Sequence, residues 1–138
     1  MNSLKLKLFT VAATLAIAAT TASAQVTLRA AVPFSFTVGQ SQVLAAGDYS
    51  IRNGGQAWYI TSDQTFHANL ALPTASVESE RTDKAELVFH CRSNGCRLAA
   101  IHAGWGNRGA EFKENRGKSD SQELSRVVIV PATVSKSL

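Results

Sequence analysis

Three histidines and two cysteines are the residues of this sequence best suited to hold a metal ion. Imidazole nitrogen and thiolate sulfur are common ligands of zinc, which takes four protein ligands, or three and a water molecule. The cysteines, Cys91 and Cys96, have four residues between them, and there is no second cysteine pair. The histidines, His67, His90 and His102, stand well apart in the sequence. Whether these side chains can share an ion therefore depends on the elements that carry them.

The residues around the cysteines favour a disulfide over a metal site. Residues 93–95 (Ser-Asn-Gly) have turn chemistry, and the segments on either side have the residue types of strands. Opposed residues in an antiparallel hairpin are 4.5–5.5 Å apart, roughly the separation that a disulfide needs. We therefore expect a structural disulfide within a hairpin over residues 85–103. Its register pairs Cys91 with Cys96, Phe89 with Leu98, and Leu87 with Ala100.

This hairpin separates the histidines. His90 alternates with Phe89 and Cys91, so it is expected on the face opposite the disulfide, whereas the parity of His102 places it on the disulfide face. His67 is expected on the polar face of a different strand. We therefore predict no metal site and no cofactor.

Nucleophilic and acid–base catalysis have little support in the sequence. Bridged cysteines are not thiolates, and no serine lies in a Gly-x-Ser-x-Gly elbow. The acidic pairs, Glu78 with Glu80 and Asp83 with Glu86, lie in or beside a charged segment, which we interpret as a solvated loop. The sequence therefore predicts a protein that is not an enzyme.

Aromatic side chains are the remaining candidates for ligand contact. Trp105 lies in a glycine-rich segment that lacks the spacing of a phosphate-binding loop. An exposed tryptophan there could stack on a sugar ring or anchor a protein contact, and Trp58 and Tyr59 are the other candidates. The favoured interpretation is that Trp58 packs in the core and Trp105 closes the open end of the sheet.

The pattern that positions all these residues has a period of two, which is typical of half-buried β-strands. One clear example places Phe66, Ala68, Leu70 and Leu72 on a single face, which we expect to be the core face. The polar face of that strand then carries His67, Asn69 and Ala71. Other strands and the hairpin are expected at 34–38, 43–44, 49–51, 56–61, 85–103 and 127–130.

About seven or eight short strands in one domain predict an all-β fold, a small antiparallel sandwich or a partly open barrel. Pro33 indicates an edge position or a bulge for the strand that follows it. Four glycines punctuate the polar residues 104–126, which we expect to be loop-rich.

The first residues resemble a secretory signal peptide. Lys5 and Lys7 precede the apolar stretch 8–19, and Ala22-Ser23-Ala24 offers small residues for cleavage before Gln25. We therefore expect residues 1–24 to be removed and residues 25–138 to form a single exported β domain. Two cysteines in such a chain also fit an oxidising compartment.

Charge and hydropathy argue against two kinds of partner, nucleic acid and the membrane interior. The whole chain has a net charge of +4, but Lys5 and Lys7 would leave with the signal peptide, so the exported domain carries about +2. Its basic residues form no cluster, which argues against nucleic-acid binding. It has no second long apolar stretch, so no membrane span is expected after cleavage.

Three segments of the sequence resemble a group of small secreted β-rich proteins of unknown function from soil bacteria. Residues 32–39 (Val-Pro-Phe-Ser-Phe-Thr-Val-Gly), 44–51 (Leu-Ala-Ala-Gly-Asp-Tyr-Ser-Ile) and 87–90 (Leu-Val-Phe-His) match its strand and turn motifs. Ala45 departs from the proline usual in that group, and the cysteine pair is not one of its features. The resemblance implies export and a β fold, and it implies no site residues.

Together these features predict a non-enzymatic periplasmic or extracellular protein with a structural or interaction role, whose partner would be envelope protein or polysaccharide. The alternative is a carbohydrate- or cell-wall-binding module that uses exposed aromatic residues.

Overall fold

The structure, a computed structural model, describes residues 25–80, 84–114 and 124–137. The proposed signal peptide lies outside this range. The described residues form twelve strands and no helix. The strands are β1 (Gln25–Val32), β2 (Phe36–Val38), β3 (Gln42–Leu44), β4 (Gly47–Asn53), β5 (Trp58–Ser62), β6 (Ala68–Ala71), β7 (Ala75–Glu78), β8 (Glu86–Arg92), β9 (Gly95–His102), β10 (Arg108–Glu111), β11 (Arg126–Pro131) and β12 (Thr133–Ser137).

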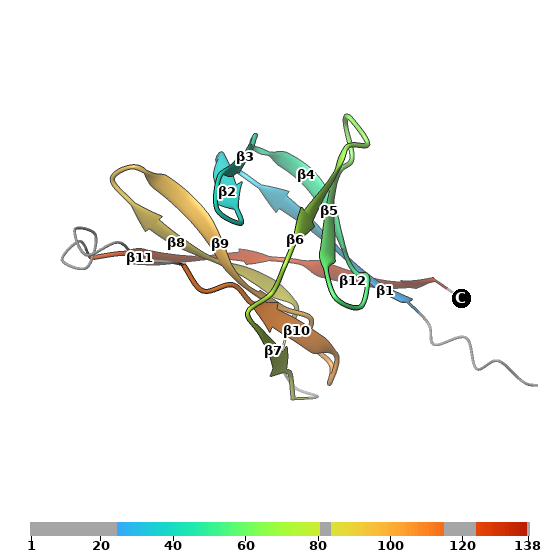
Figure 1. Cartoon of the computed structure of the whole chain (residues 1–138). Helices are drawn as coiled ribbons and strands as arrows, with labels where there is room; N and C mark the ends of the chain where they lie inside the picture. The colour runs from blue at the N-terminus through green and yellow to red at the C-terminus, as the bar shows by residue number, and fades with distance from the viewer. Residues whose placement is uncertain (1–24, 81–83, 115–123, 138) are drawn as a thin grey trace, which may run out of the picture.

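The strands build two sheets (Figure 1), which confirms the predicted all-β class and corresponds to a small sandwich. Sheet A has the order β12-β1-β4-β5-β6, and sheet B has the order β11-β8-β9-β10-β7. The β2–β3 hairpin joins sheet B through a parallel pairing of β2 with β9. The sheets do not close into a barrel, and the number of strands exceeds the predicted seven or eight.

Several of the additional strands arise where the chain passes between the sheets. Ala132 is the single residue between β11 and β12, and the chain passes there from sheet B to sheet A. Its N–H donates to the carbonyl of Ala85 at 3.0 Å. The apolar residues 127–130 thus form β11 in sheet B, and the more polar residues that follow form β12 in sheet A. β1 pairs with both β12 and β4, and its alternating Leu28, Ala30 and Val32 are buried. The sequence analysis did not predict β1, although this alternation has the period of two that is typical of a half-buried strand.

The core lies between the sheets and contains an aromatic cluster. The ring of Phe89 in β8 is fully buried and meets the rings of Phe34 and Phe36 edge to face, at centroid distances of 5.0 and 5.3 Å. Phe36 also meets Tyr49 of β4 at 5.3 Å. The cluster connects sheet A to sheet B, and edge-to-face contacts of this kind stabilise beyond the area they bury.

The structure excludes the edge position expected for the strand after Pro33, and it adds one short strand to the segment expected to be loop-rich. β2 is not an edge strand, because it pairs with β3 on one side and with Cys96 and Arg97 of β9 on the other. The segment expected to be loop-rich contains β10, which pairs with both β9 and β7. In both cases long-range pairing decides the strand, and periodicity within a few residues does not reveal it.

Candidate interaction surface

The structure places the three aromatic candidates in different environments. Trp58 faces the core from β5 and is only 4% exposed, so the expectation that it packs in the core is confirmed. Its neighbour Tyr59 points away from the core, and its ring lies under the guanidinium of Arg52, 5.5 Å from the ring centroid. Trp105 lies between β9 and β10 and is 68% exposed. It therefore does not close the end of the sheet.

These aromatic residues do not combine into one binding surface. Trp58 and Tyr59 belong to sheet A, whereas Trp105 follows the last residues of β9 in sheet B. The turn that carries Trp105 is tied to the end of β7, because the Gly104 N–H donates to the Ser79 hydroxyl at 3.3 Å and the Gly106 N–H to the Glu80 carbonyl at 3.3 Å. Trp105 is thus an isolated exposed ring.

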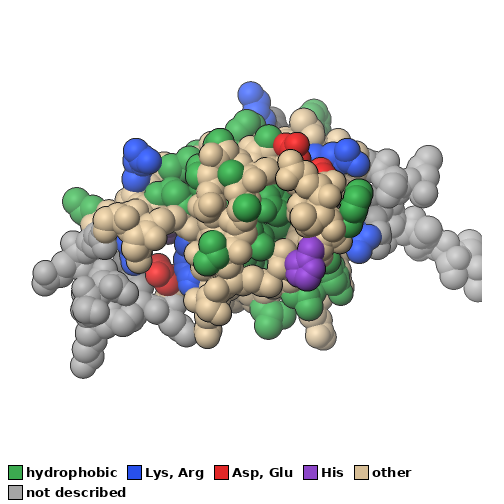
Figure 2. All heavy atoms as spheres, turned by 90° about the horizontal axis from the view of Figure 1, so that it is seen from above, with side chains coloured by type: hydrophobic (Ala, Val, Ile, Leu, Met, Phe, Trp, Pro, Cys, Tyr) green, Lys and Arg blue, Asp and Glu red, His purple; other side chains and the backbone are tan. Residues whose placement is uncertain are grey.

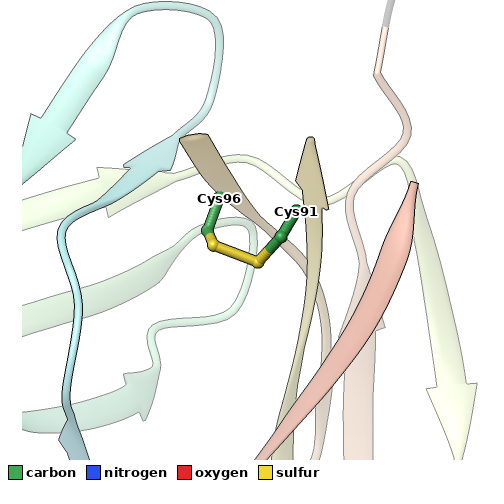
Figure 3. Close-up of a disulfide and its surroundings, with 2 residues drawn as sticks. All are labelled: Cys91 and Cys96. Atoms are coloured by element: carbon green, nitrogen blue, oxygen red, sulfur yellow. A yellow bond between two sulfur atoms is a disulfide. The ribbon is translucent and has the colours of Figure 1, made fainter. Parts of the chain in front are cut away.

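Cys91 and Cys96 form a disulfide, with sulfur atoms 2.07 Å apart (Figure 3). They face each other at the end of the β8–β9 hairpin, as the spacing predicted, and their Cα atoms are 3.9 Å apart. Phe89 also faces Leu98, as expected. Beyond this pair a register shift occurs, so that Leu87 faces Ile101 and not Ala100.

This register shift corrects the predicted position of His102. An extra residue in β9 reverses the face on which the following side chains lie. His102 therefore faces Glu86 on the outer side of sheet B, with Nδ1 3.1 Å from the Glu86 Oε1. It shares that side with His90, which faces Arg97, but Glu86 and His90 are four residues apart along β8, roughly 13 Å.

The other polar candidates are also dispersed. His67 is exposed in the turn that precedes β6. Glu78 is not in a loop but ends β7, where its carboxylate lies 4.0 Å from Arg108. Glu86 likewise belongs to β8 and not to the charged segment before it. Asp83 lies outside the described residues. Within the described part of the chain, no three His, Cys, Asp or Glu residues are close enough to hold a metal ion.

The β6 strand shows the largest departure from the sequence pattern, because its two faces are reversed. Asn69 and Ala71 point into the core and are 4% and 1% exposed. The apolar residues expected there point outward: Leu70 is 56% exposed and Leu72 is 73% exposed. Phe66, just before the strand, is 80% exposed. We call Ala68, Leu70 and Leu72 the outer face of β6, and Phe66 belongs to the turn before it.

The register of the β5–β6 hairpin causes this reversal. Opposed residues in an antiparallel pair point to the same side of the sheet, and Trp58 and Ile60 of β5 point into the core. Their partners are Ala71 and Asn69, which must therefore point inward as well. A register different by one residue would place Leu70 and Leu72 inside. Ala71 leaves space beside the large Trp58 side chain, which Leu70 or Leu72 would not.

Hydrogen bonds hold Asn69 in its buried position. Its side-chain N–H donates to the Ile60 carbonyl at 3.5 Å, and its Oδ1 accepts from the Gln42 side chain at 2.7 Å. The second bond joins β6 to β3 across the open side of the sandwich. A buried amide with both ends bonded avoids the cost of an unpaired polar group.

An open groove of about 980 Å³ lies on the side of β6 away from β5. The segment that carries Leu70 and Leu72 forms one wall, the β2–β3 turn forms the other, and β9 contributes to the floor. The groove is partly apolar and partly charged. Its apolar side chains are Val38, Leu70, Leu72, Leu98 and Phe112, and its charged side chains are Arg97, Lys113 and Glu114.

The protein itself engages two of the charged side chains of this groove. Arg97 donates to the carbonyl of Gly39, and its Nε lies 4.0 Å from Glu114. Glu114 also lies 3.3 Å from Nη2 of Arg92, whose side chain is nearly buried. These contacts fix the β2–β3 turn and residue 114 against β9. The groove is consequently shaped by the fold, as a preformed binding surface requires.

The face of the molecule seen in Figure 2 has hydrophobic side chains interspersed among polar atoms, with basic side chains toward its margins. No helix in the described residues is long and apolar enough to cross a membrane. Comparison with known proteins found no matching family model, curated protein or solved structure.

Proposed function

We propose that this protein is exported and acts without catalysis, by binding another macromolecule in the periplasm or outside the cell. The observation that carries the proposal is the reversal of β6, which turns Leu70 and Leu72 outward beside an open groove. Exposed apolar patches on a folded domain mark contact surfaces. Export is supported by the signal-like residues 1–24 and by the disulfide.

The first test is export itself. The full 138-residue sequence is expressed in a bacterial host, and the product recovered from the periplasm or medium is weighed by mass spectrometry. The expected mass corresponds to a chain that starts at Gln25 and lacks two hydrogens because of the disulfide. A chain that stays in the cytoplasm with residues 1–24 attached would contradict export.

The binding role is tested by capture. The exported protein is immobilised and exposed separately to envelope protein and to envelope polysaccharide, alongside the Leu72→Asp variant. We expect saturable retention of one fraction, and we expect the variant to lose it, since Leu72 is 73% exposed and its replacement should not disturb the core. Retention of nothing, or equal retention by the variant, would contradict a role for this surface.

A second candidate function, carbohydrate binding, rests on Trp105. Its indole is 68% exposed and its backbone φ of 52° lies in the left-handed region, which is unusual for a large side chain. Conformations of this kind concentrate at functional sites. Glycan fractions would then quench the fluorescence of the protein, and the Trp105→Ala variant would show no such response because the remaining Trp58 is buried.

A further inference from the structure

A second, smaller cavity lies on the outer side of sheet B, at the end of the β8–β9 hairpin, where it adjoins the groove. Its volume is about 210 Å³, which is space for several water molecules or a small ligand. Glu114 is the only acidic residue among the described residues that line it. Six other lining side chains can donate hydrogen bonds, and they are Thr37, Gln40, His90, Arg92, Asn94 and Arg97.

Strand pairing brings the basic residues of this cavity together. His90 faces Arg97 across β8 and β9, and Arg97 is paired with Thr37 of β2, so these three residues form a row on the outer side of sheet B. Arg92 follows His90 by two residues along β8 and therefore lies on the same face. Its partner across the hairpin is Gly95, so no side chain of β9 stands directly opposite Arg92.

Arg92 is buried, but one end of its guanidinium lacks a hydrogen bond. The side chain is only 7% exposed, and its Nη2 is buried without a hydrogen-bond acceptor. Oε2 of Glu114 lies 3.3 Å from this nitrogen, which is close enough for an ion pair, but it is not aligned to accept a hydrogen bond. Guanidinium groups bind oxyanions best through paired, aligned hydrogen bonds. The Arg92 guanidinium therefore has a donor left for a better-placed oxygen.

Glu114 compensates the charge of the arginines only in part. Its second oxygen lies 4.0 Å from Nε of Arg97, so one carboxylate is shared between two guanidinium groups. Two positive charges and one negative charge leave +1 among the arginine and glutamate side chains of the cavity. A phosphate group carries about −1.5 to −2 near pH 7 and presents three acceptor oxygens. It thus matches two arginines better than a single carboxylate does.

We propose that this cavity binds a phosphate group, free or as a monoester, which takes the place of the Glu114 carboxylate between Arg92 and Arg97. Displacement requires only a rotation of the Glu114 side chain, which is 28% exposed. The main chain before it stays in place, because the Lys113 N–H donates to the Thr74 hydroxyl at 3.0 Å. The uncharged donors of the cavity then surround the remaining phosphate oxygens.

The phosphate site extends the proposed function and does not depend on it. No residue of β6 lines the cavity, so the Leu72→Asp variant designed for the binding assay leaves the site intact. A protein that binds phosphate but captures no envelope fraction would lose the proposed function and keep this site. A protein that captures an envelope fraction without binding phosphate would do the reverse.

The experiment titrates the purified, ¹⁵N-labelled protein with inorganic phosphate and follows the side-chain Nε–Hε signals of its arginines by NMR. Chloride keeps the ionic strength constant, so that simple screening does not change during the titration. We expect the signals of Arg92 and Arg97 to shift and to saturate with a Kd of about 1 mM or lower. The signal of Arg108, an exposed arginine of β10, should stay unchanged.

Two variants change the affinity in opposite directions. Arg97→Gln removes one of the two charges and should weaken phosphate binding at least about tenfold. Glu114→Gln removes the competing carboxylate and should tighten binding by about tenfold. The matched controls are Arg108→Gln and Glu78→Gln, because these residues form a similar ion pair, 4.0 Å long, outside the cavity. Both controls should bind phosphate as the unaltered protein does.

The source of the phosphate is tested with vesicles. Phosphatidylcholine vesicles that contain phosphatidic acid present a phosphate monoester at a membrane surface, and phosphatidylcholine alone does not. Sedimentation of the protein with the first kind only, reduced by Arg97→Gln, would assign the site to a lipid head group. Saturable binding of free phosphate without sedimentation would assign it to a soluble phosphate compound.

Three results would overturn the phosphate site. The first is the absence of saturable shifts up to about 20 mM phosphate, far above the expected Kd. The second is an equal response of Arg108, which would indicate unspecific charge effects. The third is a Glu114→Gln protein that binds phosphate no more tightly than Glu78→Gln, because the carboxylate would then not occupy the place of the ligand.

Discussion

Gly109 of β10 lies directly against the backbone of Ile101 in β9. A Cβ atom at position 109 would be 2.1 Å from the Ile101 carbonyl oxygen, a distance that no side chain can adopt without backbone movement. The two strands pair through the neighbouring Ala110 and Ile101. This close approach holds β10 to sheet B and explains why glycine occupies the position.

We expect Gly109→Ala to lower the free energy of unfolding by about 1–3 kcal/mol, the usual cost of overpacking. Urea unfolding followed by circular dichroism measures the effect. Gly39→Asn is the matched control, because no atom lies within 4 Å of a Cβ at position 39 and asparagine tolerates its φ of +67°. Equal stability of Gly109→Ala and the unaltered protein would contradict the contact.

The disulfide should contribute measurably to stability. The ring it closes runs over six residues, from Cys91 to Cys96, and loop-closure entropy for so small a ring gives about 2 kcal/mol. We expect the free energy of unfolding of the Cys91→Ser/Cys96→Ser protein to be lower by this amount. The urea concentration at its unfolding midpoint should fall accordingly. A reducing agent should destabilise the unaltered protein by a similar amount and leave the double variant unchanged. A response of the double variant to reduction would point to another cause.

Tyr49 should make the fold sensitive to alkaline pH. Its hydroxyl donates to the Ala45 carbonyl at 2.5 Å, and burial raises the pKa of the phenol above its ordinary value of 10.0. In the unfolded chain the phenol ionises near pH 10, whereas in the folded chain it stays protonated. The stability that depends on it is therefore complete below about pH 10 and is lost as the pH rises toward the higher, folded-state pKa.

The Tyr49→Phe variant isolates this effect. Near neutral pH it should lose about 1 kcal/mol, because the hydrogen bond to Ala45 is gone. Above pH 10 its stability should fall less steeply than that of the unaltered protein, whose slope gains up to about 1.4 kcal/mol per pH unit from this group. Unfolding curves collected across the alkaline range compare the two. Parallel pH profiles would contradict the role of Tyr49.

The two tryptophans should differ in access to solvent. Trp105 is 68% exposed and Trp58 is 4% exposed, so iodide should quench the emission of only one of them. We expect the Trp105→Phe protein to be nearly resistant to iodide and to emit at shorter wavelength than the unaltered protein. Strong quenching of that variant would show that Trp58 is not in the core.

The buried Asn69 should depend on Gln42. Removal of the donor by Gln42→Ala leaves the Asn69 Oδ1 without its bond at 2.7 Å, and an unsatisfied buried acceptor costs about 1–3 kcal/mol. Adding Asn69→Leu removes the acceptor and should restore part of the loss. Thermal unfolding of the single and double variants tests this coupling, and an additive further loss in the double variant would contradict it.

Local sequence was sufficient to predict the all-β class, the β8–β9 hairpin and its disulfide. The alternation of apolar and polar residues, the turn residues and the sequence spacing of Cys91 and Cys96 are all patterns within a few residues. They can therefore be recognised in the sequence without knowledge of the tertiary structure. The inward position of Trp58 was predictable on the same basis. The signal-like segment and the resemblance to secreted β-rich proteins remain predictions.

Tertiary structure decided the features that depend on register. An extra residue in β9 moves His102 to the outer side of sheet B beside Glu86, and parity alone cannot reveal it. In β6 the apolar pattern predicted Leu70 and Leu72 inside, but pairing with Trp58 and Ile60 places Asn69 and Ala71 there. A strand has two faces one residue apart, and only its partner strand selects which face meets the core.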